Sequence, residues 1–115
     1  SESLLLATKA GIDLKQLYDL LMNSTGGSAM LQRSFPFIAA RDFAARFSID
    51  LLHKDLRLLL EMAKQLGIDV PGGRLAYQAV DEAKAAGHGH LDIASMLLPM
   101  EERNGVQVES RSSVD

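Results

Sequence analysis

The spacing of apolar residues between Ser48 and Gly67 constrains the fold of this chain more than any other feature of its sequence. Apolar side chains recur there at alternating intervals of four and three residues, which is the period of one helix face. Ser48 is a residue type that caps helix N-termini, and Gly67 is the type that ends helices in the left-handed conformation. Because a second apolar stripe runs beside the first, we expect this helix to be central in a bundle. The first stripe is Leu52, Leu56, Leu59, Ala63 and Leu66, and the second is Leu51, Leu58 and Met62.

The rest of the chain also has the pattern of helices separated by glycine and proline. No stretch alternates apolar and polar residues for long, so strands are not expected. Asp13 followed by Gln16 is a capping-box pattern that predicts the start of a helix. The sequence therefore predicts an all-α fold, a bundle of about five to six helices. The further helices are expected over residues 1–10, from Asp13 to about 22, from 28 to about 33 with a short one to 40, over 73–86 and over 93–100.

Length, composition and charge exclude several classes of protein. A chain of 115 residues with 47% hydrophobic residues is one domain by length and is not mostly disordered. The net charge of -3 lacks the basic excess of a nucleic-acid binder, and no apolar run reaches the roughly 18–20 residues of a membrane span. The absence of cysteine excludes disulfides, thiolate zinc sites and a cysteine nucleophile. The cytoplasm is the expected compartment, with residues 1–102 forming the helical domain and residues 103–115 a flexible tail.

A polar pair interrupts the second stripe of the long helix. Asp55 occupies a position where an apolar residue is expected, so its carboxylate must find a partner or face a cleft. Lys54 follows Asp50 by one helical turn, and an ion pair between them is the simpler account of its charge. Arg57 and Glu61 form a similar pair. The spacing makes Lys54 and Asp55 candidates for a functional role.

Two other segments carry weaker signals. His88, His90 and Asp92 have metal-ligand chemistry, but two glycines between them also suit a flexible polar turn. The loop Asn23–Ser28 could offer backbone N–H groups to an anion, yet it lacks the terminal Gly-Lys-Ser/Thr of a phosphate-binding loop. We therefore expect a turn at each place, without a metal.

Five short motifs follow one another along residues 1–100. They are Lys9-Ala10-Gly11-Ile12-Asp13, Asn23–Ser28, Phe47-x-x-x-Leu51-x-x-Lys54-Asp55-Leu56, Leu66–Pro71 and Ala86–Gly89 ahead of Asp92. In this order they resemble the C-terminal helical domain of the β-hydroxyacid dehydrogenases, and the combination is more specific than any motif alone. That family includes 3-hydroxyisobutyrate dehydrogenase and tartronate semialdehyde reductase and, more distantly, 6-phosphogluconate dehydrogenase.

The resemblance implies an NAD(P)-dependent 3-hydroxyacid dehydrogenase with two domains. Its N-terminal Rossmann domain would bind NAD or NADP, and its catalytic lysine would lie in a Gly-x-x-x-Lys-x-x-Asn-Asn pattern. This chain has neither motif, so we expect that lysine upstream of Ser1 and the chain to be inactive alone. By the resemblance, Lys54 reaches the nicotinamide cofactor, and Phe47 and Asp55 form the substrate end of the cleft. The implied substrate is a short hydroxy acid or its semialdehyde, and the implied assembly is a homodimer or tetramer.

Two other hypotheses remain open at this point. The chain could be a stand-alone helical dimerisation module without a cofactor, in which case its first helix needs no further chain to complete its apolar face. It could also be a metal-dependent regulator that uses His88, His90 and Asp92. The sequence is compatible with either NAD or NADP as the cofactor and with several short hydroxy acids as the substrate. It also assigns no effect on specificity to His53, which precedes the Lys-Asp pair.

Overall fold

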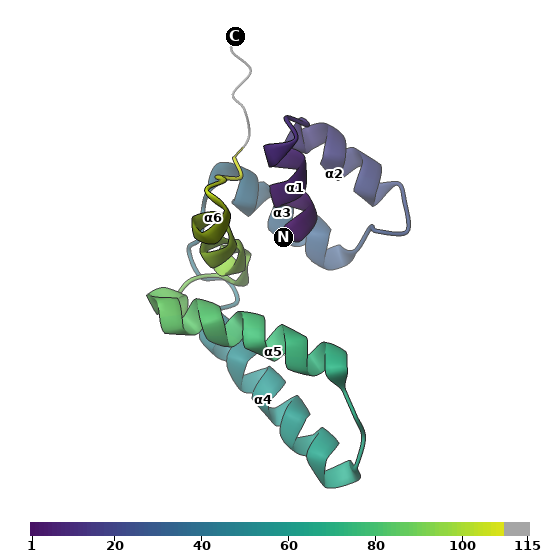
Figure 1. Cartoon of the computed structure of the whole chain (residues 1–115), viewed down its shortest axis with the longest axis vertical. Helices are drawn as coiled ribbons and strands as arrows, with labels where there is room; N and C mark the ends of the chain where they lie inside the picture. Colours follow the sequence, from purple (N-terminus) through teal and green to yellow (C-terminus); the bar gives the residue numbers. More distant parts are fainter. Residues whose placement is uncertain (110–115) are drawn as a thin grey trace. The chain divides into compact units, whose positions relative to one another are not determined.

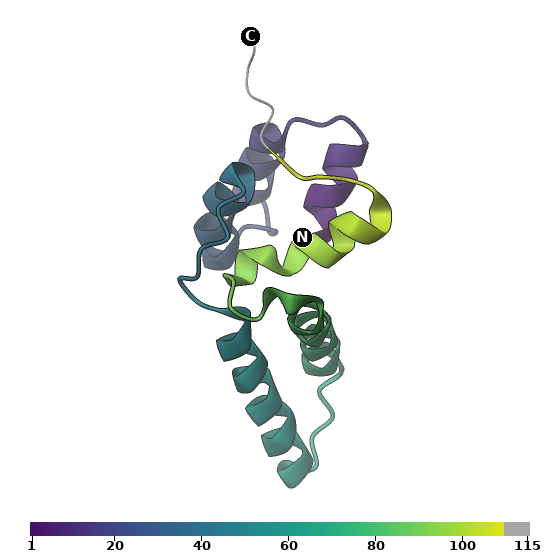
Figure 2. The same ribbon diagram turned by 90° about the vertical axis from the view of Figure 1, so that its left-hand side faces the viewer.

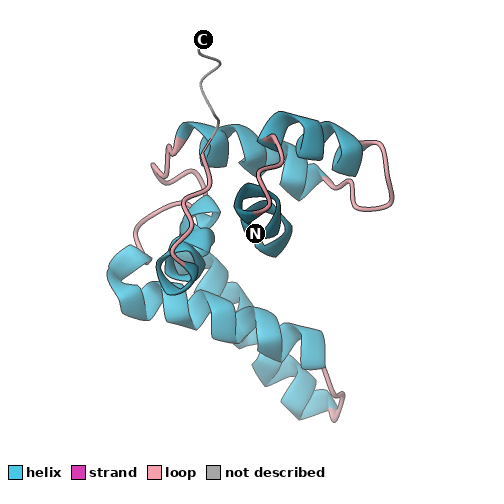
Figure 3. Cartoon of the chain, turned by 45° about the horizontal axis from the view of Figure 1, so that its top comes forward, coloured by secondary structure: helices cyan, strands magenta, loops and turns pink. Residues whose placement is uncertain are grey.

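The computed structural model describes residues 1–109, and over this range the fold is all-α. Figure 3 draws no strand, and the only β-type pairing within these residues is an isolated bridge between Ser48 and Asp92. The prediction of an all-α fold with five to six helices is confirmed. The helices are α1 (Glu2–Lys9), α2 (Leu14–Met22), α3 (Ala29–Ala40), α4 (Ile49–Leu66), α5 (Pro71–Ala83) and α6 (Leu98–Asn104), with a π-helical turn at Lys84–His88 and a 3-10 turn at Ile93–Leu97.

The chain divides into two compact units. Unit 1 comprises residues 1–43 and 100–109, and unit 2 comprises residues 44–99. In unit 1, α2 packs against both α1 and α3. In unit 2, α4 and α5 lie side by side and are joined by the short loop at residues 67–70, as both views show (Figure 1, Figure 2).

Local sequence signals set most helix boundaries. The Asp13 carboxylate accepts a hydrogen bond from the backbone N–H of Gln16 at 3.0 Å, which caps α2. The Ser48 hydroxyl accepts one from the N–H of Leu51 at 3.2 Å and caps α4. Gly67 ends α4 with φ +67°, a left-handed conformation that favours glycine. These predictions are confirmed because each depends on neighbouring residues only.

Proline positions account for two differences from the predicted helices. Pro36 lies inside α3, where a break between two short helices was expected. The ring removes one helical hydrogen bond, and burial of the flanking Phe35 and Ile38 offsets that loss. Pro71 is the first residue of α5, so this helix begins two residues before Gly73. Proline suits that position because the first N–H groups of a helix have no intrahelical partner.

A buried ion pair joins the two sequence segments of unit 1. The Arg41 guanidinium donates to both carboxylate oxygens of Glu101, at 2.9 and 3.0 Å, and to the carbonyl of Val108 at 2.8 Å. The N–H of Val108 donates to Glu101 in return. The hydrogen bonds that Arg41 donates to Glu101 raise the pKa of Arg41, although burial of the guanidinium acts in the opposite direction. The pair therefore fastens the segment after α6 to the end of α3.

This segment begins the flexible tail expected over 103–115. The structure instead continues α6 to Asn104 and buries Val108 completely. Residues 110–115 of the expected tail lie outside the described residues. The packed part of unit 1 also includes a stack of Tyr18 on Phe35, with ring centroids 4.3 Å apart. Its buried apolar residues are Leu4, Leu5, Ala7, Leu14, Phe35, Ile38 and Val108.

The core of unit 2 lies between α4 and α5. Ile49 from α4 packs with Val80 and Ala83 from α5, and Leu52 and Leu56 extend this contact along α4. The second stripe of α4 does not join this core, because Leu51, Leu58 and Met62 are all exposed. The expectation that α4 is central in a bundle is therefore wrong for the residues that the structure describes: one face of the helix packs and the other is open.

Across residues 1–109, none of the helices is both long enough and apolar enough to cross a membrane.

Candidate functional site

A buried carboxylate organises the segment that leads into α4. Asp92 is fully buried, and its Oδ2 accepts hydrogen bonds from the backbone N–H groups of Phe47 at 3.1 Å and Arg46 at 3.3 Å. Its Oδ1 accepts from the N–H of Ala94 at 3.1 Å, which caps the 3-10 turn. Asp92 is thus the N-cap of this turn. Its second action, on the loop 45 residues earlier, has no local signal in the sequence.

Backbone hydrogen bonds extend this contact to the first turn of α4. The N–H of Ile49 donates to Leu91 and that of Asp50 to Gly89, both at 2.9 Å. A side chain at Gly89 would displace the Asp50 carboxylate, because a Cβ there would lie 2.5 Å from one of its oxygens. We call the paired segments 46–50 and 89–94 the α4 clamp. The clamp fixes where α4 begins and therefore where Phe47, just ahead of the helix, is held.

Lys54 and Asp55 lie on the open side of α4, one turn beyond the clamp. Their Nζ and Oδ1 atoms are 3.4 Å apart, and the side chains are 54% and 53% exposed. The expected pair of Lys54 with Asp50 is wrong, because Asp50 is 3.1 Å from Lys84 of the π-helical turn. Asp50 turns toward Lys84 because the clamp seats its carboxylate beside Gly89.

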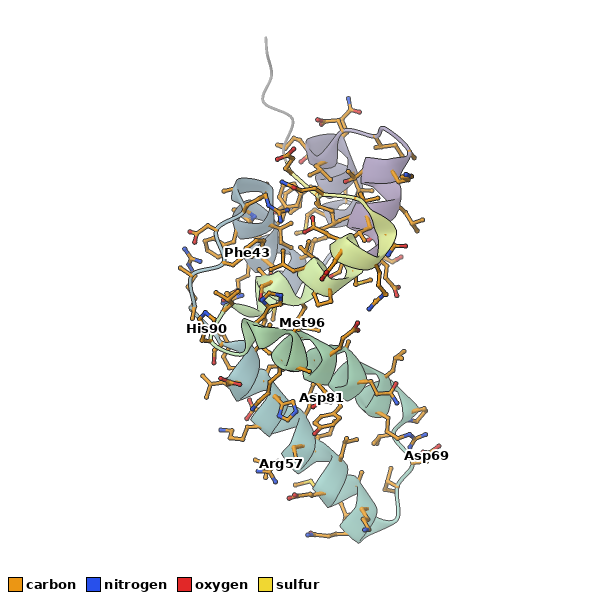
Figure 4. The ribbon with its side chains drawn as sticks, turned by 60° about the vertical axis from the view of Figure 1, so that its left-hand side comes forward. Phe43, Arg57, Asp69, Asp81, His90 and Met96 are labelled. Carbon is orange, nitrogen blue, oxygen red and sulfur yellow. The ribbon has the colours of Figure 1, made fainter. Side chains whose placement is uncertain are left out.

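The second ion pair expected on α4 is present. Arg57 and Glu61 are 2.6 Å apart, and Figure 4 labels Arg57 on this helix. Both side chains are about half exposed, so the pair is a solvated surface contact.

Asp55 was expected to need a partner or a cleft because it interrupts an apolar stripe. The stripe itself is exposed, so the carboxylate is solvated and no burial penalty arises. What the arrangement provides is an open surface with an ammonium, a carboxylate and two leucines, Leu51 and Leu58, on the same side of one helix.

The other candidates from the sequence are not brought into this group. His88 is half-buried in the π-helical turn and His90 is exposed. In the part of the chain that the structure describes, no three His, Asp or Glu side chains are placed to hold a metal ion. The loop Asn23–Ser28 belongs to unit 1, where the N–H of Gly26 donates to the hydroxyl of Ser24 and that of Gly27 to its carbonyl. These two N–H groups are already used within the turn.

His53 has a role that its sequence position does not indicate. Its ring lies on the α5 side of α4, 2.8 Å from Asp81 and stacked at an angle on Tyr77. The side chain is 15% exposed, so it belongs to the contact between the helices. The interaction spans 28 residues, which explains why sequence reasoning missed it.

Comparisons with known proteins agree on one family. The family described as "NAD-binding of NADP-dependent 3-hydroxyisobutyrate dehydrogenase" matches residues 1–100. The chain is 34% identical to the Arabidopsis thaliana protein named "Probable 3-hydroxyisobutyrate dehydrogenase-like 1, mitochondrial", over 97% of its own length and 34% of that protein. It is also 34% identical to 2-(hydroxymethyl)glutarate dehydrogenase of Eubacterium barkeri, over 94% of its length and 36% of the relative.

A solved structure shares the fold. The crystal structure of a 3-hydroxyisobutyrate dehydrogenase from Salmonella typhimurium superposes with a TM-score of 0.79 and 30% identity, over 86% of this chain and 34% of that one. The chain thus spans about a third of the length of the relatives that it matches.

Proposed function

Because the chain belongs to the family of the NAD-binding region of 3-hydroxyisobutyrate dehydrogenases, we propose that it is the C-terminal helical domain of an NAD(P)-dependent 3-hydroxyacid dehydrogenase. Such an enzyme oxidises a short 3-hydroxy acid or reduces the corresponding semialdehyde. The single observation that supports this most is the exposed Lys54–Asp55 pair, set on an open face of α4 and held one turn beyond the α4 clamp.

The residues on this face fit a nicotinamide cofactor. Lys54 carries three N–H donors, and a contact of 3.4 Å to the neighbouring Asp55 leaves donors for a ligand. We assign Lys54 to holding the cofactor, and Phe47 and Asp55 to the substrate end of the cleft. When bound, the cofactor supplies the hydride acceptor or donor. The protein's part is to orient the reactants and to exchange the proton of the substrate hydroxyl.

The proton would be exchanged by a lysine that is not among the residues of this chain. We propose that this lysine and a Rossmann domain belong to the same protein, as the threefold greater length of the relatives supports. The cytoplasm remains our expected compartment, and a homodimer or tetramer our expected assembly.

An activity assay tests this proposal. The full-length protein that contains this chain is mixed with NAD⁺ or NADP⁺ and with 3-hydroxyisobutyrate or 2-(hydroxymethyl)glutarate, the substrates in the names of its relatives. We expect reduced nicotinamide to form with at least one substrate, and none with the 115-residue chain alone. Failure to turn over either substrate, together with no binding of NAD(P)H, would contradict the proposal.

One observation favours a second function, a helical self-association module. The exposed stripe Leu51, Leu58 and Met62 is an apolar face without a partner among the described residues. Sedimentation of the 115-residue chain separates the two readings: a dimer that Leu58→Glu dissociates supports the module. A monomer whose sedimentation is unchanged by Leu58→Glu would contradict the self-association module and favour the dehydrogenase proposal.

A further inference from the structure

A polar cluster crosses the contact between α4 and α5. His53 Nε2 lies 2.8 Å from Asp81 Oδ1, and the His53 ring centroid lies 4.8 Å from that of Tyr77. Tyr77 and Asp81 are one turn apart on α5, so a single α4 side chain touches two successive turns of the neighbouring helix. Figure 4 labels Asp81 on this helix. Because an ionised carboxylate only accepts, the histidine must donate from Nε2.

This cluster restricts a motion that the apolar contacts permit. Ile49, Leu52 and Leu56 pack against small and branched side chains of α5, and such contacts are not directional. A hydrogen bond between the two helices adds a restraint on the rotation of α4 about its axis, since its geometry is directional. Lys54 follows His53 directly, so the rotation that satisfies Asp81 also decides where Lys54 points.

We propose that His53 and Asp81 are positioning residues that aim Lys54 at the cofactor. This inference rests on the proposed function. It states that the contact of His53 with Asp81, on the α5 side of α4, sets the direction of the binding residue on the open side of the same helix. The cluster suits this role better than the Asp50–Lys84 pair does. Asp81 is 58% exposed, but His53 is only 15% exposed and stacks on Tyr77, so one side of this contact is held between the helices. Both members of the Asp50–Lys84 pair are about half exposed and neither is held in this way.

The test measures NADH and NADPH affinity by fluorescence titration of the full-length protein, so it does not depend on turnover. Asp81→Ala removes the acceptor, and Asp81→Asn retains an oxygen that accepts from Nε2. Glu61→Ala is the matched control, because it breaks an exposed ion pair on α4 that does not reach α5. The variant Lys54→Ala and the double variant with Asp81→Ala complete a thermodynamic cycle.

We expect Asp81→Ala to weaken cofactor binding about fivefold, as the loss of one hydrogen bond predicts. Asp81→Asn should restore most of the affinity, and Glu61→Ala should leave it unchanged. In the Lys54→Ala background, Asp81→Ala should have no further effect, because its action passes through Lys54. A merely structural role would instead give the same loss in both backgrounds.

The outcomes separate the two hypotheses. If Lys54→Ala weakens binding but Asp81→Ala behaves like Glu61→Ala, or if the two effects are additive, the positioning role is overturned and the proposed function stands. If Lys54→Ala itself leaves the affinity unchanged, the proposed site is wrong and the inference falls with it.

Discussion

Units 1 and 2 each contain a buried carboxylate that connects segments distant in sequence, but the two carboxylates serve different ends. In unit 1, Glu101 binds the Arg41 guanidinium and the backbone N–H of Val108, and so closes the packed end of the chain. In unit 2, Asp92 binds backbone N–H groups of the loop that precedes α4. The Glu101 carboxylate holds the segment that follows α6, whereas the Asp92 carboxylate fixes the start of α4, a helix with one exposed face.

The comparison shows how stability and binding are divided along the chain. Interactions that hold the fold are buried in both units, while Lys54 and Asp55 are more than half exposed. A ligand can therefore compete for this pair at little cost to folding. A substitution should lower the free energy of unfolding more when the group it removes is more deeply buried and when it leaves more hydrogen-bond partners unpaired.

The largest effect is expected for Glu101→Ala. The substitution leaves the half-buried Arg41 guanidinium without its carboxylate, which should lower the free energy of unfolding by about 3 kcal/mol. Urea denaturation measures the loss, and native-state hydrogen exchange should locate it in unit 1. Glu102→Ala, at an exposed position of α6, is the control. Equal stability of the two variants would mean that the buried pair does not hold unit 1.

Asp92→Asn should have the next largest effect. The amide retains one acceptor oxygen but turns an NH₂ group toward backbone donors, so a loss of about 2 kcal/mol is expected. Hydrogen exchange should rise in residues 46–50 of unit 2, in contrast to Glu101→Ala. The exposed Asp69→Asn in the same unit serves for comparison. Faster exchange in unit 1 alone would break the distinction between the two carboxylates.

Gly89→Ala tests the close approach inside the α4 clamp. The added methyl group would displace the Asp50 carboxylate and disturb its pair with Lys84, at a cost of about 1 kcal/mol. Gly72→Ala is a matched control, because its Cβ would meet nothing within 4 Å in the first turn of α5. There we expect stabilisation by about 0.5 kcal/mol. Thermal unfolding of both variants should therefore give shifts of opposite sign, and shifts of the same sign would contradict the clamp.

Lys54→Ala should change stability least. The side chain is half exposed and its pair with Asp55 is solvated, so the free energy of unfolding should stay within about 0.5 kcal/mol of the wild type. Urea denaturation of the 115-residue chain is the measurement. A loss as large as that of Glu101→Ala would show that Lys54 belongs to the fold rather than to a binding surface.

Sequence reasoning succeeded where the deciding residues are neighbours. The cap at Ser48 and the left-handed stop at Gly67 depend on a few adjacent residues, and both are confirmed. It failed for the exposed stripe of α4, because which of two apolar faces is buried depends on the partner helix. The His53–Asp81 contact and the Arg41–Glu101 pair, separated by 28 and 60 residues, have no local pattern that could reveal them.

The candidate site shows the same division. The spacing singled out Lys54 and Asp55, and the structure places them together on an open face. The predicted ion pair of Lys54 with Asp50 was wrong. Gly89 and Lys84 determine where the Asp50 carboxylate lies, and both come more than 30 residues after Asp50 in the chain. The assignment of Lys54 to the cofactor and of Asp55 to the substrate remains a prediction that rests on the family.

The most direct test of that assignment is the affinity of the full-length protein for NADH and NADPH, measured for the wild type, Lys54→Ala and Lys15→Ala. Lys15 is another exposed lysine, paired with Asp19 in unit 1, so it controls for loss of a surface charge. We predict that Lys54→Ala weakens binding of the preferred cofactor about tenfold, as expected for the loss of a charged hydrogen bond, while Lys15→Ala leaves it unchanged. Equal affinities for all three proteins would contradict the account.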